Sequence, residues 1–202
     1  VLYFYNRGHD ISLITDQPVN IPGIEIFTIG KNETKFRIPV FSSVYQVIRK
    51  TLAINKLLKK INPDILHSHY VNIYGFLGAL TGFYPHIATC HGSDLLVHPN
   101  RSKVERFFVK TALKHADVIT LPSRQMKKVA VKYGAVEEKI YQVQYGIELN
   151  KIKPAQQPAN IINIRCCGNL RAEYKTDVVI SALAELVKKY PGIHLNILGD
   201  GP

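Results

Sequence analysis

The chain has 202 residues, enough to bury a substantial core in one large domain or in parts of two. Its hydrophobic fraction of 46% and charged fraction of 20% exclude an intrinsically disordered chain. The formal net charge of +11 favours an anionic partner, such as a phosphate-bearing substrate, an acidic lipid surface or nucleic acid. Because the basic residues are spread along predicted helices and form no basic tail, we expect no nucleic-acid binding.

Cysteine usage and hydropathy bear on the compartment. Cys90, Cys166 and Cys167 lie in apolar runs and show no metal-ligand spacing, which predicts reduced, buried thiols and no metal site. No apolar stretch approaches the ~20 residues that cross a bilayer. We therefore expect a cytoplasmic protein.

The first predicted elements are a helix end, two strands and a long helix. Residues 1–8 resemble the last turns of a helix that ends at a glycine. Residues 9–15 and 23–29 are rich in β-branched and aromatic residues and predict strands. Apolar residues recur at helical spacing over 41–61, between several Lys and Arg residues, which predicts a basic amphipathic helix.

The next part of the chain alternates regularly between strands and helices. This order at short intervals predicts a parallel sheet with helices on both faces, a doubly wound α/β domain. The predicted strands are 65–69, 86–90, 118–121 and 140–143, and the predicted helices are 73–83, 103–115 and 123–133.

A stretch with two prolines and no periodicity, residues 151–160, predicts a linker. A second strand–helix–strand pattern follows it at 161–167, 176–190 and 193–198. One such unit cannot bury a stable core alone, so we expect it to begin a second, truncated α/β domain. The predicted organisation is a domain at 1–150, a linker at 151–160 and the start of a second domain at 161–202.

Polar and small residues gather at the predicted strand ends. In open parallel sheets, ligands bind outside the carboxyl ends of the strands. The same residue types also occur in turns for backbone reasons, and this alternative stays open for each one. The candidates are His67, His69, His91, Gly92, Asp94, Ser123, Gly146 and the segment from Gly168 to Lys175.

Several short phrases together resemble one protein family, the retaining GT-B glycosyltransferases of glycosyltransferase family 4. They are R-G-H-D-I-S-L-I-T at 7–15, P-D-I-L-H-S-H at 63–69, T-C-H-G-S-D at 89–94, A-D-V-I-T-L-P-S at 116–123 and Q-Y-G-I-E at 144–148. The fourth phrase differs in one spacing, and the last has Glu where the family usually has Asp. Their order and distances along nearly the whole chain carry the resemblance.

The resemblance implies a GT-B-like enzyme with two Rossmann-like domains. The first domain would hold the acceptor, which is a glycan, a lipid-linked molecule or a small molecule, and the second would hold a nucleotide-diphosphate sugar. Transfer would retain the anomeric configuration and require no metal or other cofactor. His91 would be the catalytic residue that faces the donor sugar, and the acceptor-side cleft would include His69, Gly92, Asp94, Ser123 and Gly146.

The second domain would bind the donor's phosphates. The family usually carries an Arg where this chain has Asn169, and a Lys at the position of Lys175. Gly168 and Arg171 complete the implied phosphate site. The family's first strand with its glycine-rich loop, and its paired glutamates, would lie outside residues 1–202, so we expect this chain alone to lack transferase activity.

Two alternatives and one further partner remain open. A GT-B-fold sugar-nucleotide epimerase shares the two-domain plan, and a non-catalytic GT-B module would bind sugar nucleotide or a partner without turnover. The basic segments 41–61 and 101–115 would either attract an anionic membrane or form the solvated faces of surface helices.

Overall fold

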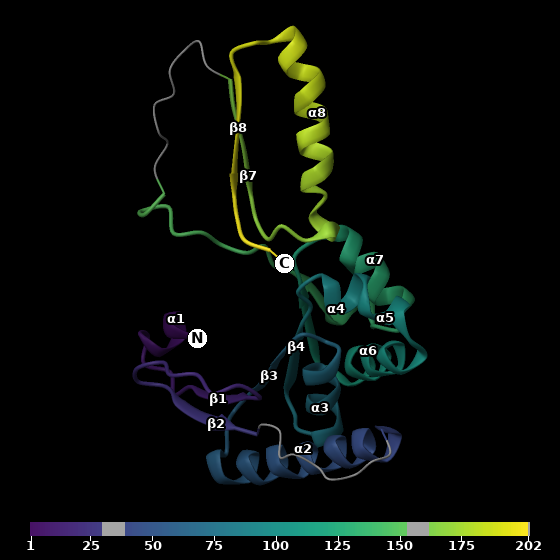
Figure 1. Ribbon diagram of the computed structural model, residues 1–202. Coiled ribbons are helices and arrows are strands. Elements are labelled where there is room, and N and C mark those ends of the chain that lie inside the picture. The colour runs from purple at the N-terminus through teal and green to yellow at the C-terminus, as the bar shows by residue number, and fades with distance from the viewer. Residues whose placement is uncertain (30–38, 153–161, 202) are drawn as a thin grey trace. The chain divides into compact units, whose positions relative to one another are not determined.

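The computed structural model describes residues 1–29, 39–152 and 162–201, which fall into two compact units (Figure 1). Unit 1 is Val1–Gly146 and unit 2 is Ile147–Pro202. From residue 153 onward, the predicted linker lies outside the described residues. The domain limits of 1–150 and 161–202 stay predictions.

Unit 1 alternates short strands with helices. Its strands are β1 (Ser12–Thr15), β2 (Glu25–Thr28), β3 (Leu66–His69), β4 (His86–Thr89), β5 (Val118–Leu121) and β6 (Ile140–Gln142). Its α-helices are α1 (Leu2–Tyr5), α2 (Pro39–Ile61), α3 (Ile73–Thr81), α4 (Ser93–Leu96), α5 (His98–Arg101), α6 (Lys103–His115) and α7 (Arg124–Lys132), and a 3₁₀ turn, η1, spans Glu137–Lys139.

The strands of unit 1 pair only in parallel within the described residues. Strands β1 and β2 form one sheet, and a four-stranded sheet has the order β3-β4-β5-β6. Parallel neighbours require crossovers, and helices α3, α6 and α7 provide them in the four-stranded sheet (Figure 1). The predicted α/β class with parallel pairing is confirmed.

The main core lies on one face of the four-stranded sheet. Ala88, Ile119 and Ile140 sit side by side in the register of β4, β5 and β6, and all are buried. They share a buried cluster with α6 and α7, represented by Leu113 and Met126. Because successive side chains of a strand point to opposite faces, the neighbouring histidines and threonines lie on the other face.

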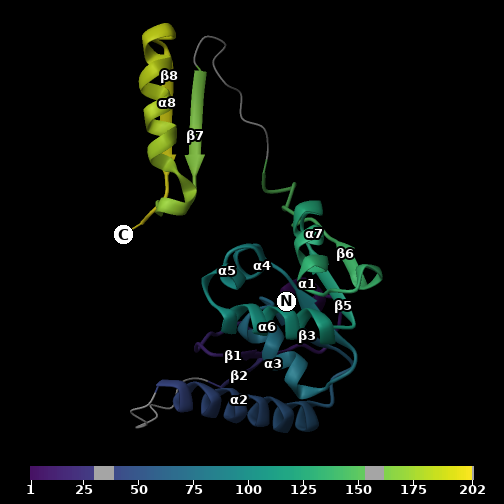
Figure 2. The ribbon, with the colours of Figure 1, turned by 90° about the vertical axis from the view of Figure 1, so that its right-hand side faces the viewer.

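A second apolar cluster joins α2, α3 and β3. Leu58 of α2 and Leu77 of α3 are its buried centre, with Leu66 of β3 packed against them. Helix α2 packs beneath α3 in the view of Figure 2. The long amphipathic helix predicted at 41–61 therefore covers its neighbour with some of its apolar residues, chiefly Ile54 and Leu58.

Serine caps fix where two crossover helices begin. The Ser102 hydroxyl accepts a hydrogen bond from the Glu105 N–H at the start of α6, and the Ser123 hydroxyl accepts one from the Met126 N–H at the start of α7. The loop from β5 into α7 consists of residues 122–123.

Helices α4 and α5 were not predicted. Each has four residues, too few for a periodic pattern to be visible in the sequence. Helix α4 follows Gly92, whose φ of 131° suits glycine, and α5 has a proline in its first turn. They fill the connection between β4 and α6.

Unit 2 consists of β7 (Ile162–Cys167), the 3₁₀ turn η2 (Ala172–Tyr174), α8 (Thr176–Lys189) and β8 (Ile193–Leu198). The two strands are parallel. The expectation of buried thiols is correct for Cys90 but wrong for the other two: Cys166 is half-buried and Cys167 is exposed. Within the described residues of unit 2, α8 is the one α-helix that can cover these strands.

Candidate functional site

The carboxyl edge of the four-stranded sheet brings together three side chains of unit 1. His69 is the last residue of β3, His91 follows the end of β4, and Tyr145 follows the end of β6. Parallel strands place these ends at one edge of the sheet, as the sequence predicted for His69 and His91.

Hydrogen bonds engage both ring nitrogens of His91. Its Nε2 lies 3.0 Å from Nδ1 of His69, and its Nδ1 lies 3.1 Å from the hydroxyl oxygen of Tyr145. Tyr145 was not among the predicted site residues, although the neighbouring Gly146 was. The motif that contains both is the signal that could have found it.

Tyr70 covers one face of the His91 ring. The two rings are parallel to within 8°, with centroids 4.7 Å apart. Tyr70 has a φ of 73°, a left-handed conformation that costs a non-glycine residue about 1 kcal/mol. Its N–H donates to the Thr89 carbonyl oxygen at 3.0 Å, which holds this turn beside β4. Backbone strain at a cluster of polar groups is a feature of functional sites.

Asp94 holds the two loops that carry these rings. Its side chain is fully buried, and its carboxylate accepts hydrogen bonds from the backbone N–H groups of Val71 at 2.9 Å, His91 at 3.0 Å and Gly92 at 2.8 Å. We predicted Asp94 as a residue of the acceptor-side cleft. The structure uses its carboxylate inside the protein, where it positions the His91 loop.

A polar row continues from the site across the strands. His67 Nε2 lies 2.7 Å from Thr89 Oγ1, which lies 2.6 Å from Thr120 Oγ1. The His67 ring stacks on His69 with centroids 4.3 Å apart. These residues lie on the sheet face opposite the core.

The crowded imidazoles of this row resist protonation. Desolvation, followed by repulsion from His69 and other histidines, lowers the pKa of His67 to about 4. Desolvation and then repulsion from His91 lower the pKa of His69. Part of each ring still reaches solvent. At neutral pH, His67 and His69 are therefore neutral, and each offers one donor and one acceptor nitrogen.

Two of the remaining predicted residues of unit 1, Ser123 and Gly92, have backbone roles. The Ser123 hydroxyl caps α7, and the positive φ of Gly92 allows the turn into α4. Gly146 is exposed and ends unit 1. Their predicted contact with an acceptor stays a prediction.

The predicted phosphate-binding residues of unit 2 lie where β7 leads into α8. Gly168, Asn169, Arg171 and Lys175 are all exposed. Lys175 directly precedes α8, in a left-handed conformation. The free N–H groups at a helix start attract anions, and nearby cations add to this. The segment has the chemistry for a phosphate group.

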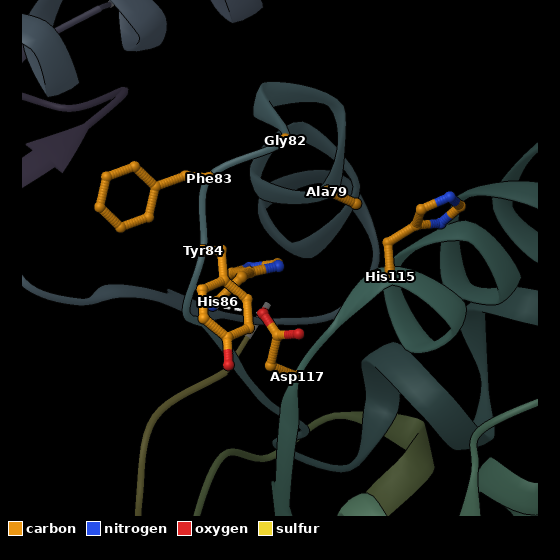
Figure 3. A pocket seen from close by; sticks show the side chains of 7 residues that line it. All are labelled: Ala79, Gly82, Phe83, Tyr84, His86, His115 and Asp117. Atoms are coloured by element: carbon orange, nitrogen blue, oxygen red, sulfur yellow. Dashed lines mark hydrogen bonds between the residues drawn. The ribbon is translucent and has the colours of Figure 1, made fainter.

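A separate cavity of about 210 Å³ lies at the amino ends of β4 and β5 (Figure 3). His86, Asp117 and Tyr84 contribute to its lining. The His86 ring is buried against α3 and shares a hydrogen bond of 2.9 Å with the Ser68 hydroxyl, and its pKa is lowered by desolvation. This cavity lies at the sheet edge opposite the His91 cluster.

Metal ligands do not gather in the part of the chain that the structure describes. There, no group of three or more His, Cys, Asp or Glu side chains has a geometry that could hold an ion. The histidines of the cluster contact one another directly.

Comparisons with known proteins agree on one family. A model of the family described as glycosyl transferase 4-like matches residues 1–123. A Bacillus subtilis protein with the name "Putative teichuronic acid biosynthesis glycosyltransferase TuaC" is 24% identical over 182 residues, which is 78% of this chain and 46% of that protein. The chain thus spans about half the length of this relative.

Solved structures share the fold at low sequence identity. HepE of Anabaena, in complex with UDP and glucose, has a TM-score of 0.63 and 16% identity over 96% of this chain and 62% of its own. The lipopolysaccharide outer core galactosyltransferase WaaB has a TM-score of 0.61 and 14% identity over 95% of this chain and 61% of its own. The predicted GT-B-like fold is confirmed.

Replacing the buried carboxylate should loosen the site. Asp94→Asn keeps the shape of the side chain but puts an amide NH₂ group against backbone donors. We expect the free energy of unfolding to fall by about 2–4 kcal/mol in urea titrations followed by circular dichroism. The exposed Asp64→Asn is the matched control. Equal stability of the two variants would show that the Asp94 charge does not hold these loops.

The depressed pKa of His67 should make stability depend on pH. Between pH 6.5 and about 4 the unfolded chain binds a proton at this residue and the folded chain does not, so stability falls as the pH falls. His67→Gln removes this titrating side chain from both the folded and the unfolded chain. The loss of stability between pH 7.5 and 5 should then be smaller than in the parent or in a His9→Gln control. An unchanged loss would contradict the assignment.

Proposed function

The chain belongs to the glycosyl transferase 4-like family, and on this basis we propose that it forms part of an enzyme that transfers a sugar from a nucleotide-diphosphate sugar to an acceptor. The observation that carries the proposal is the family match over residues 1–123, which contain His69 and His91. These two histidines form the polar cluster at the edge of the sheet where α/β proteins bind ligands.

His91 is the proposed catalytic residue. An imidazole can hydrogen-bond a sugar hydroxyl, and it can stabilise positive charge as the glycosidic bond opens. The ring is half-buried. The Asp94 carboxylate accepts a hydrogen bond from the backbone N–H of His91, and the Tyr70 ring stacks on one face of the imidazole. A fixed ring at a strand end suits a group that must meet one sugar position repeatedly.

Unit 2 is proposed to bind the donor's phosphates. Lys175 and Arg171 are exposed cations near the start of α8, whose N–H groups add a favourable partial charge. Asn169 brings no charge at the position where the family usually has Arg, so Lys175 carries more of the proposed role. That HepE is in complex with UDP and glucose supports a uridine diphosphate sugar as the first donor to test.

Retention of configuration and independence from metal are part of the same proposal and rest on the family resemblance. Product analysis separates the candidates. A transferase attaches the sugar to an acceptor with unchanged anomeric configuration, whereas an epimerase leaves a nucleotide sugar with one inverted centre. A non-catalytic module binds the nucleotide sugar and yields no product.

A membrane-bound acceptor is favoured by one face of α2. Val44, Ile48 and Leu52 recur at four-residue intervals, and each is more than half exposed. Lys56 and Lys59 follow on the same helix and are exposed. Such a face suits a helix that lies on an anionic membrane. Among the described helices, none combines the length and apolar character that a membrane span requires.

Donor binding is testable by thermal shift with the complete gene product. At about 100 times its dissociation constant, a ligand stabilises the folded state by about 2.7 kcal/mol, so the right nucleotide sugar should raise the melting temperature by several degrees. Lys175→Ala should weaken binding at least tenfold, whereas Lys189→Ala at the far end of α8 should not. If no nucleotide sugar stabilises the protein, the proposed function is wrong.

Membrane binding is testable by sedimentation with liposomes. The chain should bind vesicles that contain phosphatidylglycerol more strongly than pure phosphatidylcholine vesicles, and added salt should weaken this binding. Leu52→Ser removes an exposed apolar contact and should reduce the bound fraction severalfold. Val178→Ser, at an apolar position of unit 2 that is 56% exposed against 63% for Leu52, is the control. No preference for the anionic lipid would refute the membrane proposal.

A further inference from the structure

His91 has no free ring nitrogen in the structure. Nε2 is engaged by His69 and Nδ1 by Tyr145, while Tyr70 covers one face of the ring. A sugar hydroxyl therefore cannot form a hydrogen bond with a ring nitrogen of His91 until one of these partners leaves. We infer that Tyr145 is the exchangeable partner: its hydroxyl occupies the ligand position on His91 Nδ1, and a substrate hydroxyl replaces it.

The two partners of His91 are held very differently. His69 belongs to β3, whose backbone is paired with β4, and its ring stacks on His67 at 4.3 Å. Tyr145 lies in irregular chain after β6, its side chain is 60% exposed, and it stands one residue before the end of unit 1. Moving His69 would disturb the sheet, whereas moving Tyr145 requires only a change in a surface segment.

The exchange conserves the hydrogen-bonding pattern. In one arrangement the Tyr145 hydroxyl donates to Nδ1 of His91, and His91 Nε2–H donates to His69 Nδ1. In the other, His69 Nδ1–H donates to His91 Nε2, and His91 Nδ1–H donates to the Tyr145 oxygen. A sugar hydroxyl both donates and accepts, as a phenol does, so it can replace Tyr145 in either arrangement.

His69 is then a positioning residue for the same step. The hydrogen bond between His69 Nδ1 and His91 Nε2 couples the tautomers of the two rings. Depending on the tautomer, Nδ1 of His91 meets the hydroxyl as an acceptor or as a donor. Partial desolvation and then the charge of Asp94 raise the pKa of Tyr145, and the phenol keeps its proton at neutral pH. The identity of the incoming hydroxyl as a sugar hydroxyl rests on the proposed function.

The contact itself can be tested on the 202-residue chain without any substrate. With ¹⁵N-labelled histidine, long-range ¹H–¹⁵N spectra report the proton and hydrogen-bond state of each ring nitrogen. Tyr145→Phe should shift the His91 Nδ1 signal, while Tyr141→Phe should not. Tyr141 is a similarly exposed tyrosine on β6, at 57% against 60%, and is a matched control. An unchanged Nδ1 signal in Tyr145→Phe would overturn the inference.

The competition can be tested with the complete gene product and a panel of UDP-sugars. If Tyr145 competes with the ligand, Tyr145→Phe should bind the UDP-sugar about three- to tenfold more tightly, because one neutral hydrogen bond no longer has to be broken. The affinity for UDP alone should stay constant, since UDP lacks the donor sugar whose hydroxyl would replace Tyr145. Weaker binding of the UDP-sugar would show that Tyr145 supports the ligand and would overturn the exchange. If no UDP-sugar binds any variant, the proposed function fails, and the spectra still decide the contact.

Discussion

The His91 site depends on one buried carboxylate. Asp94 accepts hydrogen bonds from three backbone N–H groups, which belong to the loops that follow β3 and β4. Without these bonds, the N–H groups of Val71 and Gly92 would lack this common acceptor, and a buried donor without a partner costs about 1–3 kcal/mol. The carboxylate thus fixes the distance between the two loops, and with it the contact between His69 and His91.

The alternation of side chains along the strands separates the core from the site. Ala88 and Ile119 face the helices and are buried, whereas their chain neighbours Thr89 and Thr120 face the other way and hydrogen-bond to each other. A shift of register by one residue would bury the threonines and expose the core. The apolar packing that stabilises unit 1 therefore also determines the positions of the hydroxyls and imidazoles, because both sets of side chains follow from the same strand register.

The sequence was informative where one strand or helix decides the outcome. Strand β5 and helix α6 have the predicted bounds. The expectation that the carboxyl ends of the parallel strands lie at one edge of the sheet correctly placed His69 and His91 together. It was less informative where a residue's role depends on a distant segment. An aspartate in a turn is compatible with a ligand contact and with a backbone acceptor, and only the path of the loop after β3 shows that the Asp94 carboxylate accepts from backbone N–H groups. Its contact with an acceptor stays a prediction. Tyr145 reaches His91 across 54 positions of sequence, so its motif could mark it as a candidate but could not identify His91 as its partner.

The two units differ in the chemistry that they offer. Near His91, the side chains of unit 1 are imidazoles and phenols. Desolvation and then repulsion between the histidines lower the pKa of His67 and of His69, so both are neutral at physiological pH. Neutral donors and acceptors recognise hydroxyl groups, whereas a diphosphate requires fixed positive charge. In unit 2 that charge stands at Arg171 and Lys175, before a helix start. Within the proposed function, the histidine cluster of unit 1 is therefore suited to hydroxyl groups, and the strand-to-helix turn of unit 2 is suited to phosphate groups.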